Sequence, residues 1–177
     1  AKPFKMNRLL QGDVGSGKTV VAFLSLLSAV EAGGQGVLMA PTEILVQQHL
    51  ENLRPIGNKV GVVVDALTGR DKGKQRDRKL AALLEGKIHI LIGTHAVFQS
   101  GVHFLDLRLA IIDEQHRFGV RQRLALGEKG QSVDVLVMTA TPIPRSLALS
   151  QYGEMDLTVL ADKPAGRKPV KTVIISD

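Results

Sequence analysis

A glycine-rich loop near the start of the chain constrains its fold most strongly. Residues Gly12 to Thr19 read Gly-Asp-Val-Gly-Ser-Gly-Lys-Thr, which is the phosphate-loop pattern. Such a loop connects a strand to a helix, because its glycines let backbone N–H groups approach phosphate oxygens and the helix N-terminus favours an anion. Arg8 to Leu10 predicts a short buried strand before the loop, and apolar residues at helical spacing from Val20 to Val30 predict the helix after it. The sequence therefore predicts a nucleotide-binding α/β fold.

The rest of the chain alternates short apolar runs with longer helical patterns, which is typical of a parallel sheet built from βαβ units. We expect a mostly parallel sheet with helices on both faces, in one domain over residues 1–161. Residues 162–177 are interpreted as a linker and the start of an unfinished second unit. The further strands are predicted at 37–40, 60–64, 88–92, 109–112 and 133–138, and the further helices from Thr42 to about Leu53 and from about Asp71 to Glu85.

The phosphate loop assigns roles to its last residues. Lys18 can reach the β- and γ-phosphates of a nucleotide, and the Thr19 hydroxyl can ligate Mg²⁺. The alternative is a glycine-rich turn without a ligand, but the predicted strand before it and helix after it favour a nucleotide site. The predicted nucleotide-binding residues are Gly12, Gly15, Ser16, Gly17, Lys18 and Thr19.

Two acidic residues follow the apolar run 109–112. Asp113 stands at the end of a predicted strand, where a second Mg²⁺ ligand belongs in such a fold. Glu114 can orient and deprotonate an attacking water molecule. Taken by themselves, the two acids are compatible with a solvated strand end; together with the phosphate loop they predict hydrolysis of a nucleotide.

Thr139 and Thr141 follow the predicted strand 133–138 directly. Hydroxyl groups at the carboxyl end of a parallel strand face the crevice where ligands bind. They could hydrogen-bond Glu114 or His116 and report the state of the nucleotide. A Thr-Pro turn that caps a helix over 145–150 explains the same residues equally well.

Composition limits the possible partners. The net charge of +6 suggests a polyanion, although many proteins are mildly basic. Basic residues cluster from Arg70 to Lys79, where a solvated helix face is favoured over a contact with a phosphate backbone. With 3% aromatic residues, base stacking is not expected to dominate binding of nucleic acid.

The chain contains no cysteine, which excludes disulfides and thiolate metal sites and suits a reducing cytoplasm. No apolar run approaches the ~20 residues of a membrane span, and no signal peptide is predicted. Since no His pair has metal-ligand spacing, a zinc site is not expected. No partner can be assigned to His49, His89 or His103.

Together these motifs resemble the first motor lobe of a superfamily-two helicase over nearly the whole chain. Gly12 to Thr19 is similar to the first motif, and Asp113 to Val120 to motif II. The remaining similar segments are Ala40 to Leu45 with Gln47, Gln48 and His49 (motif Ia), Thr68 to Arg70 (the Thr-Gly element), Gly93 to Ala96 (motif Ib) and Thr139 to Arg145 (motif III).

The resemblance implies a RecA-like domain that uses ATP and Mg²⁺ and acts on DNA. Lys18, Asp113, Glu114 and His116 would form the catalytic set, with Thr19 and Asp113 holding the metal. Gln115, Thr139 and Thr141, together with His116, would couple nucleotide state to the grip on DNA. The residues expected to face the sugar-phosphate backbone are Pro41, Thr42, Gly69, Arg70, Thr94 and His95.

Motors of this type have a second lobe with an arginine finger, and a separate domain that recognises DNA. This chain matches neither part, so we expect a monomeric piece of a longer protein with negligible unwinding activity of its own. Gln115 favours the branch-migrating DNA helicases over the transcription-repair coupling factors, which usually have Glu at this position. The rival interpretations are a nucleotide switch or small-molecule kinase, and a non-catalytic DNA-binding module.

Overall fold

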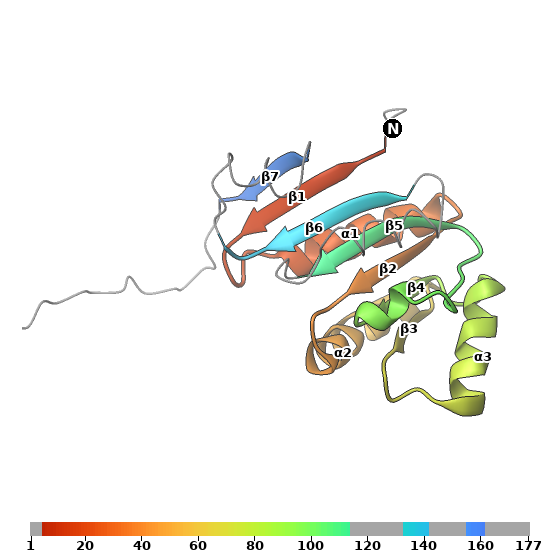
Figure 1. Cartoon of the computed structure of the whole chain (residues 1–177). Helices are drawn as coiled ribbons and strands as arrows, with labels where there is room; N and C mark the ends of the chain where they lie inside the picture. Colours follow the sequence, from red (N-terminus) through yellow and green to blue (C-terminus); the bar gives the residue numbers. More distant parts are fainter. Residues whose placement is uncertain (1–4, 114–132, 142–154, 162–177) are drawn as a thin grey trace, which may run out of the picture.

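In a computed structural model, which describes residues 5–113, 133–141 and 155–161, the chain forms a seven-stranded sheet with helices on both faces (Figure 1). The strands lie in the order β3-β4-β2-β5-β6-β1-β7, and every neighbouring pair is parallel. The predicted α/β fold is confirmed. The elements are β1 (Asn7–Gly12), α1 (Lys18–Glu31), β2 (Gln35–Met39), α2 (Glu43–Lys59), β3 (Val64–Leu67), α3 (Gly73–Leu84), β4 (Ile90–Gly93), the 3₁₀ helix η1 (His95–Phe98), β5 (Leu107–Asp113), β6 (Asp134–Thr139) and β7 (Asp156–Leu160).

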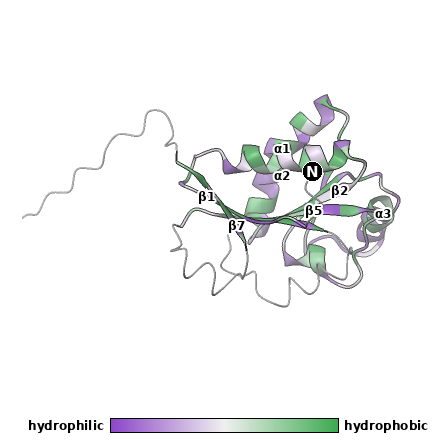
Figure 2. Cartoon of the chain, turned by 90° about the horizontal axis from the view of Figure 1, so that it is seen from above, coloured by the Kyte–Doolittle hydropathy of each residue, from purple (hydrophilic) through white to green (hydrophobic). Residues whose placement is uncertain are grey.

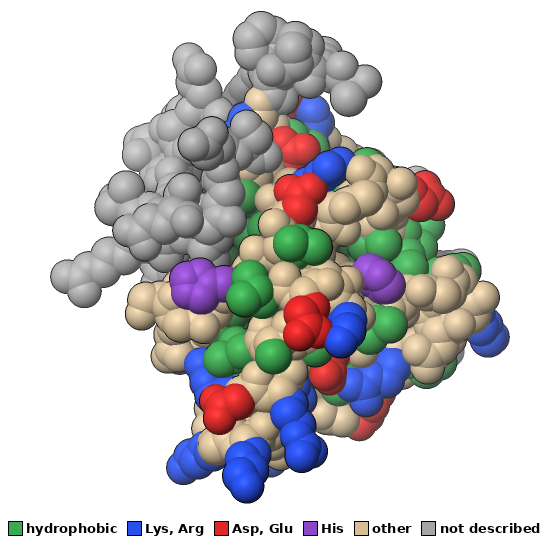
Figure 3. Space-filling view, turned by 90° about the vertical axis from the view of Figure 1, so that its right-hand side faces the viewer, with side chains coloured by type: hydrophobic (Ala, Val, Ile, Leu, Met, Phe, Trp, Pro, Cys, Tyr) green, Lys and Arg blue, Asp and Glu red, His purple; other side chains and the backbone are tan. Residues whose placement is uncertain are grey.

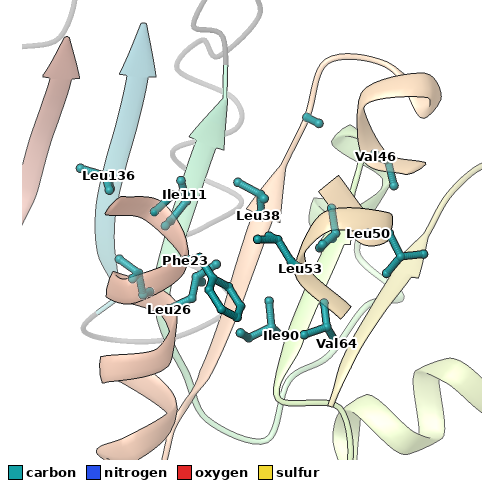
Figure 4. Packing of buried hydrophobic residues seen from close by; sticks show 14 of the residues in the cluster. Phe23, Leu26, Leu38, Val46, Leu50, Leu53, Val64, Ile90, Ile111 and Leu136 are labelled. Carbon is teal, nitrogen blue, oxygen red and sulfur yellow. The ribbon is translucent and has the colours of Figure 1, made fainter. Parts of the chain in front are cut away.

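Helices α1 and α2 cover one face of the sheet, and α3 and η1 lie on the other (Figure 2). Because successive strand residues point to opposite faces, Leu38 of β2 packs beneath α1 and α2 while its neighbour Val37 packs on the far side. Figure 4 shows Phe23 of α1 and Leu53 of α2 in the same buried cluster as Leu38. Burial on both faces explains the continuous apolar runs of the central strands.

The predicted strand over 60–64 is wrong. Helix α2 continues through Pro55 to Lys59, six residues beyond the predicted end near Leu53, and β3 begins only at Val64. The chain reverses at Gly61, whose φ of 72° lies in the left-handed region that favours glycine. Strand β3 then runs through Asp65, whose carboxylate accepts a hydrogen bond from Arg54 of α2 at 2.7 Å.

Strand β7 was not predicted from the sequence. It pairs with β1 at the edge of the sheet, where Leu157 and Val159 remain exposed. Its polar residues are bound by β1: Arg8 donates to the Thr158 hydroxyl at 2.7 Å and to the Asp156 carboxylate at 3.1 Å.

The predicted helix over 145–150 and the linker over 162–169 lie outside the described residues. None of the helices in the described part of the chain combines the length and apolar composition of a membrane span.

Candidate nucleotide site and nucleic-acid face

The phosphate loop connects β1 to α1, as the sequence predicts. Gly15 and Gly17 have φ angles of 82° and 91°, in the left-handed region where other residues are strained. The Ser16 N–H donates to the Asp13 carbonyl at 3.1 Å and closes the turn. A Cβ added to Gly17 would meet no atom within 4 Å, so the loop is open to a ligand at this glycine.

Polar side chains of the loop are directed at its own backbone or buried. The Lys18 ammonium donates to the carbonyls of Gly12 and Asp13 at 2.7 and 2.8 Å. The Ser16 hydroxyl is buried and has no hydrogen-bond partner among the described residues. A buried polar group without a partner costs about 1–3 kcal/mol, so this hydroxyl fits a loop built around a polar ligand such as a phosphate.

Asp113 ends β5 close to the loop. Thr19, at the start of α1, and Asp113 line the same cavity of about 600 Å³ between α1 and α2. Most other side chains of this cavity are apolar, including Phe23, Leu24 and Leu53. Hydroxyl and carboxylate oxygens are ligands that Mg²⁺ prefers, so the donor set of Thr19 and Asp113 fits this ion.

His49 contacts Asp113, a partner that the sequence did not reveal. Its Nε2 lies 2.7 Å from Oδ2 of Asp113, and the two side chains are only 9% and 17% exposed. The signal was the helical spacing of His49 with Val46 and Leu53, which places it on the buried side of α2. His89 also has a partner, because its Nδ1 accepts a hydrogen bond from the Val63 N–H at 2.9 Å.

Thr139, the last residue of β6, contacts Thr141. Thr139 is buried, and its hydroxyl accepts a hydrogen bond from the Thr141 N–H at 3.1 Å. This geometry is a local turn; the helix over 145–150 that one of the two sequence interpretations would have it cap lies outside the described residues. The predicted partners Glu114 and His116, together with Gln115, lie outside the described residues, so the coupling role of these residues stays a prediction.

The predicted nucleic-acid residues lie at the end of the sheet where the parallel strands finish, called the carboxyl edge below. Met39 and Leu67 both lie opposite Gly93 in register, so β2, β3 and β4 end at the same level. The residues that follow these strands are therefore neighbours: Pro41 and Thr42 after β2, Gly69 and Arg70 after β3, and Thr94 and His95 after β4.

The side chains on this edge differ in their exposure and in their hydrogen-bond partners. The Thr42 hydroxyl accepts from the Leu45 N–H at 3.3 Å and caps α2. Arg70 is 87% exposed and pairs with Glu43 at 2.8 Å. His95 is exposed and Thr94 is buried, so Thr94 presents little side chain to a ligand.

The basic run continues from this edge into α3. Lys79 donates to Asp71 and to the Ala66 carbonyl, each at 2.7 Å, and Arg76 donates to Gln99 at 3.3 Å. Lys72, Lys74 and Arg78 are exposed. Figure 3, which faces the side of the molecule carrying α3, shows Lys and Arg side chains gathered at its lower end. Both interpretations of this run, a solvated face and a phosphate contact, are compatible with this arrangement.

The order of the strands divides the carboxyl edge in two. The phosphate loop follows β1, and Asp113 and Thr139 are the last residues of β5 and β6, whereas the predicted nucleic-acid residues follow β2, β3 and β4. The sequence pattern of the DEAD/DEAH box helicases matches residues 4–149. The chain belongs to the DEAD/DEAH box helicase family.

Relatives of this DEAD/DEAH box domain support the predicted resemblance to branch-migrating helicases. The ATP-dependent DNA helicase RecG of Bacillus subtilis (strain 168) is 55% identical over 172 residues, covering 97% of this chain and 25% of the relative. RecG of Escherichia coli (strain K12) is 52% identical over 176 residues, with the same coverage of 97% and 25%. The chain thus spans about a quarter of the length of these relatives.

Solved structures of helicases are also similar to this chain. A structure of RecG bound to a three-way DNA junction is similar to the DEAD/DEAH box domain with a TM-score of 0.77 and 47% identity, over 94% of this chain and 22% of that one. The helicase domain of Pyrococcus furiosus Hef matches with a TM-score of 0.68 and 22% identity, over 89% and 36% of the two chains. The second likeness concerns the fold alone.

Proposed function

We propose that this chain is the first motor lobe of a RecG-like ATP-dependent DNA helicase that remodels branched DNA. The observation that supports the proposal is the separation of two groups of residues along the carboxyl edge: the phosphate loop and Asp113 stand at the ends of β1 and β5 (the proposed nucleotide half), and the predicted nucleic-acid residues follow β2, β3 and β4 (the proposed nucleic-acid half). The similarity to RecG over 97% of the chain, and to a RecG structure bound to a DNA junction, supports the choice of substrate.

The nucleotide half supplies the groups that ATP hydrolysis needs. The amides of the phosphate loop and the Lys18 ammonium would bind the phosphates. Thr19 and Asp113 would hold Mg²⁺, which when bound neutralises charge on the phosphate oxygens. Glu114, next in the chain after Asp113, would take a proton from the attacking water as the bond between the γ-phosphorus and the leaving oxygen breaks, which yields ADP and phosphate.

The other half would grip DNA. Exposed Thr42, Arg70 and His95, with Pro41, Gly69 and Thr94, would lie against the sugar-phosphate backbone, which carries no sequence information. A second lobe, entered through residues 162–177, would add an arginine finger worth roughly a thousandfold or more in rate. A separate domain would recognise the branch, and the protein would act as a monomer in the cytoplasm.

Glu114→Gln tests the proposal in a polypeptide that carries both lobes. ATP turnover stimulated by branched DNA should fall by about a hundredfold or more while ATP still binds, because only the base is lost. Glu31→Gln, a change of an exposed acid in the last turn of α1, is the matched control and should leave turnover unchanged. Unchanged turnover in Glu114→Gln would place the base elsewhere. Turnover of the unaltered protein that ignores DNA would favour a nucleotide switch or small-molecule kinase.

A further inference from the structure

We propose that His49 is a positioning residue, which holds the Asp113 carboxylate in the orientation that Mg²⁺ binding requires and ties α2 to the nucleotide site. The inference rests on the proposed role of Asp113 as a metal ligand. It adds to that role His49, a residue of α2 that stands 64 positions before Asp113 in the chain.

The direction of the hydrogen bond follows from the chemistry of the two groups. An ionised carboxylate can only accept, so the hydrogen is on Nε2 of His49 and is donated to Oδ2 of Asp113 over 2.7 Å. The contact uses Oδ2 of Asp113, so Oδ1 is the oxygen that we assign to the ion or to a water molecule bound to it. Since both side chains are largely shielded, water competes little for the bond.

A purely structural role does not require histidine at this position. His49 lies on the buried side of α2 beside Val46, Leu50 and Leu53, where an apolar side chain would pack as well. A polar ring buried there is costly unless it is hydrogen-bonded, and for Nε2 the structure gives Asp113 as the partner. Hydrogen-bond partners of metal ligands typically contribute 10–100-fold to metal affinity, which sets the size of effect expected here.

The position of His49 adds a connection across the sheet. Helix α2 starts beside Thr42, on the nucleic-acid half of the edge, and His49 lies about two turns further along it. Asp113 ends β5, on the nucleotide half. The His49–Asp113 hydrogen bond therefore joins the helix that presents Thr42 to the strand that presents the metal ligand.

The test is a titration of the chain with a fluorescent ATP analogue at a series of Mg²⁺ concentrations. His49→Leu fills the same space without a donor, and should raise the half-saturating Mg²⁺ concentration by about tenfold or more. The affinity of His49→Leu for the analogue, measured without Mg²⁺, should equal that of the unaltered chain. His49→Gln, whose Nε2 can take the place of the imidazole Nε2, should restore most of the loss. His103→Leu removes an exposed histidine and should behave as the unaltered chain does.

The outcomes separate the inference from the proposed function. If Mg²⁺ does not affect nucleotide binding by the unaltered chain, both fail. If Mg²⁺ tightens binding but His49→Leu has the same Mg²⁺ dependence, or loses affinity equally with and without the ion, only the positioning role of His49 is overturned. If His49→Leu does not fold, His49→Asn replaces it, because the asparagine side chain is too short for its amide to reach Asp113.

A double variant tests whether His49 acts through Asp113. If it does, His49→Leu added to Asp113→Asn should change the Mg²⁺ dependence no further than Asp113→Asn alone. Additive losses in the double variant would contradict the inference.

Discussion

Single residues at the carboxyl edge differ in how well water can reach their ion pairs. Arg70 and Glu43 meet at 2.8 Å, but Arg70 is so exposed that the pair contributes little to stability and is free to exchange for a phosphate. Lys79 and Asp71 meet at 2.7 Å with side chains that are mostly shielded. The first pair is thus suited to binding and the second to holding the turn after β3.

The Asp71–Lys79 pair makes the stability of the chain depend on pH. Burial would raise the pKa of Asp71, but the hydrogen bonds from Lys79 and Thr68 outweigh it, and the pKa is lowered. A carboxyl whose folded pKa lies below its unfolded value of about 4 stabilises the fold above that pH and loses this contribution as the pH falls through the folded pKa.

Lys79→Met should therefore lower the free energy of unfolding at pH 7, and its deficit against the unaltered chain should shrink below about pH 4. Part of the deficit remains, because Lys79 also donates to the Ala66 carbonyl. Urea unfolding at a series of pH values measures both quantities. Lys87→Met, which breaks the exposed Lys87–Glu85 pair, should have little effect. A deficit for Lys79→Met that is constant with pH would contradict the account.

Among the elements, α2 and β3 are joined by a close approach at Gly57. A Cβ at this position would lie 2.7 Å from the Val62 carbonyl oxygen and 2.7 Å from Cγ2 of Val64. The backbone oxygen cannot rotate away as the end of a side chain can. Gly57 thus lets the last turn of α2 pack against the start of β3.

Gly57→Ala should destabilise the chain by about 1–3 kcal/mol through this overpacking, less the gain of up to about 1 kcal/mol from the better helix former. Gly101→Ala is the matched control, since a Cβ there meets no atom within 4 Å. Denaturant unfolding of both variants provides the comparison. A Gly57→Ala chain as stable as the unaltered one would show that the contact is not restrictive.

Sequence patterns predicted the central strands well, because strands that are buried on both faces appear in the sequence as continuous apolar runs. They failed at β3 and β7, which form the two edges of the sheet. There Asp65 and Asp156 pair with Arg54 and Arg8, partners that no local pattern reveals. The same difference between local and distant signals holds for the candidate site. The phosphate loop and Asp113 were predicted from local motifs, whereas the contact between His49 and Asp113 became visible only in the folded structure.

The molecule as a whole places the two proposed binding functions on adjacent halves of one sheet edge. The strand order sets this division, because β5, β6 and β1 lie together and so do β3, β4 and β2. Helix α2 contacts both halves, through Thr42 at its start and His49 further along. A change at the nucleotide thus has a short structural route to the proposed DNA face.

The most direct test of this account is a crystal structure of the chain with Mg²⁺ and a non-hydrolysable ATP analogue. We expect the phosphates against the amides of residues 15–19, and one ion shared by the phosphates, the Thr19 hydroxyl and Asp113, directly or through water. A nucleotide bound elsewhere, or a carboxylate at position 113 too far from the phosphates to share an ion with Thr19, would contradict the proposed motor function.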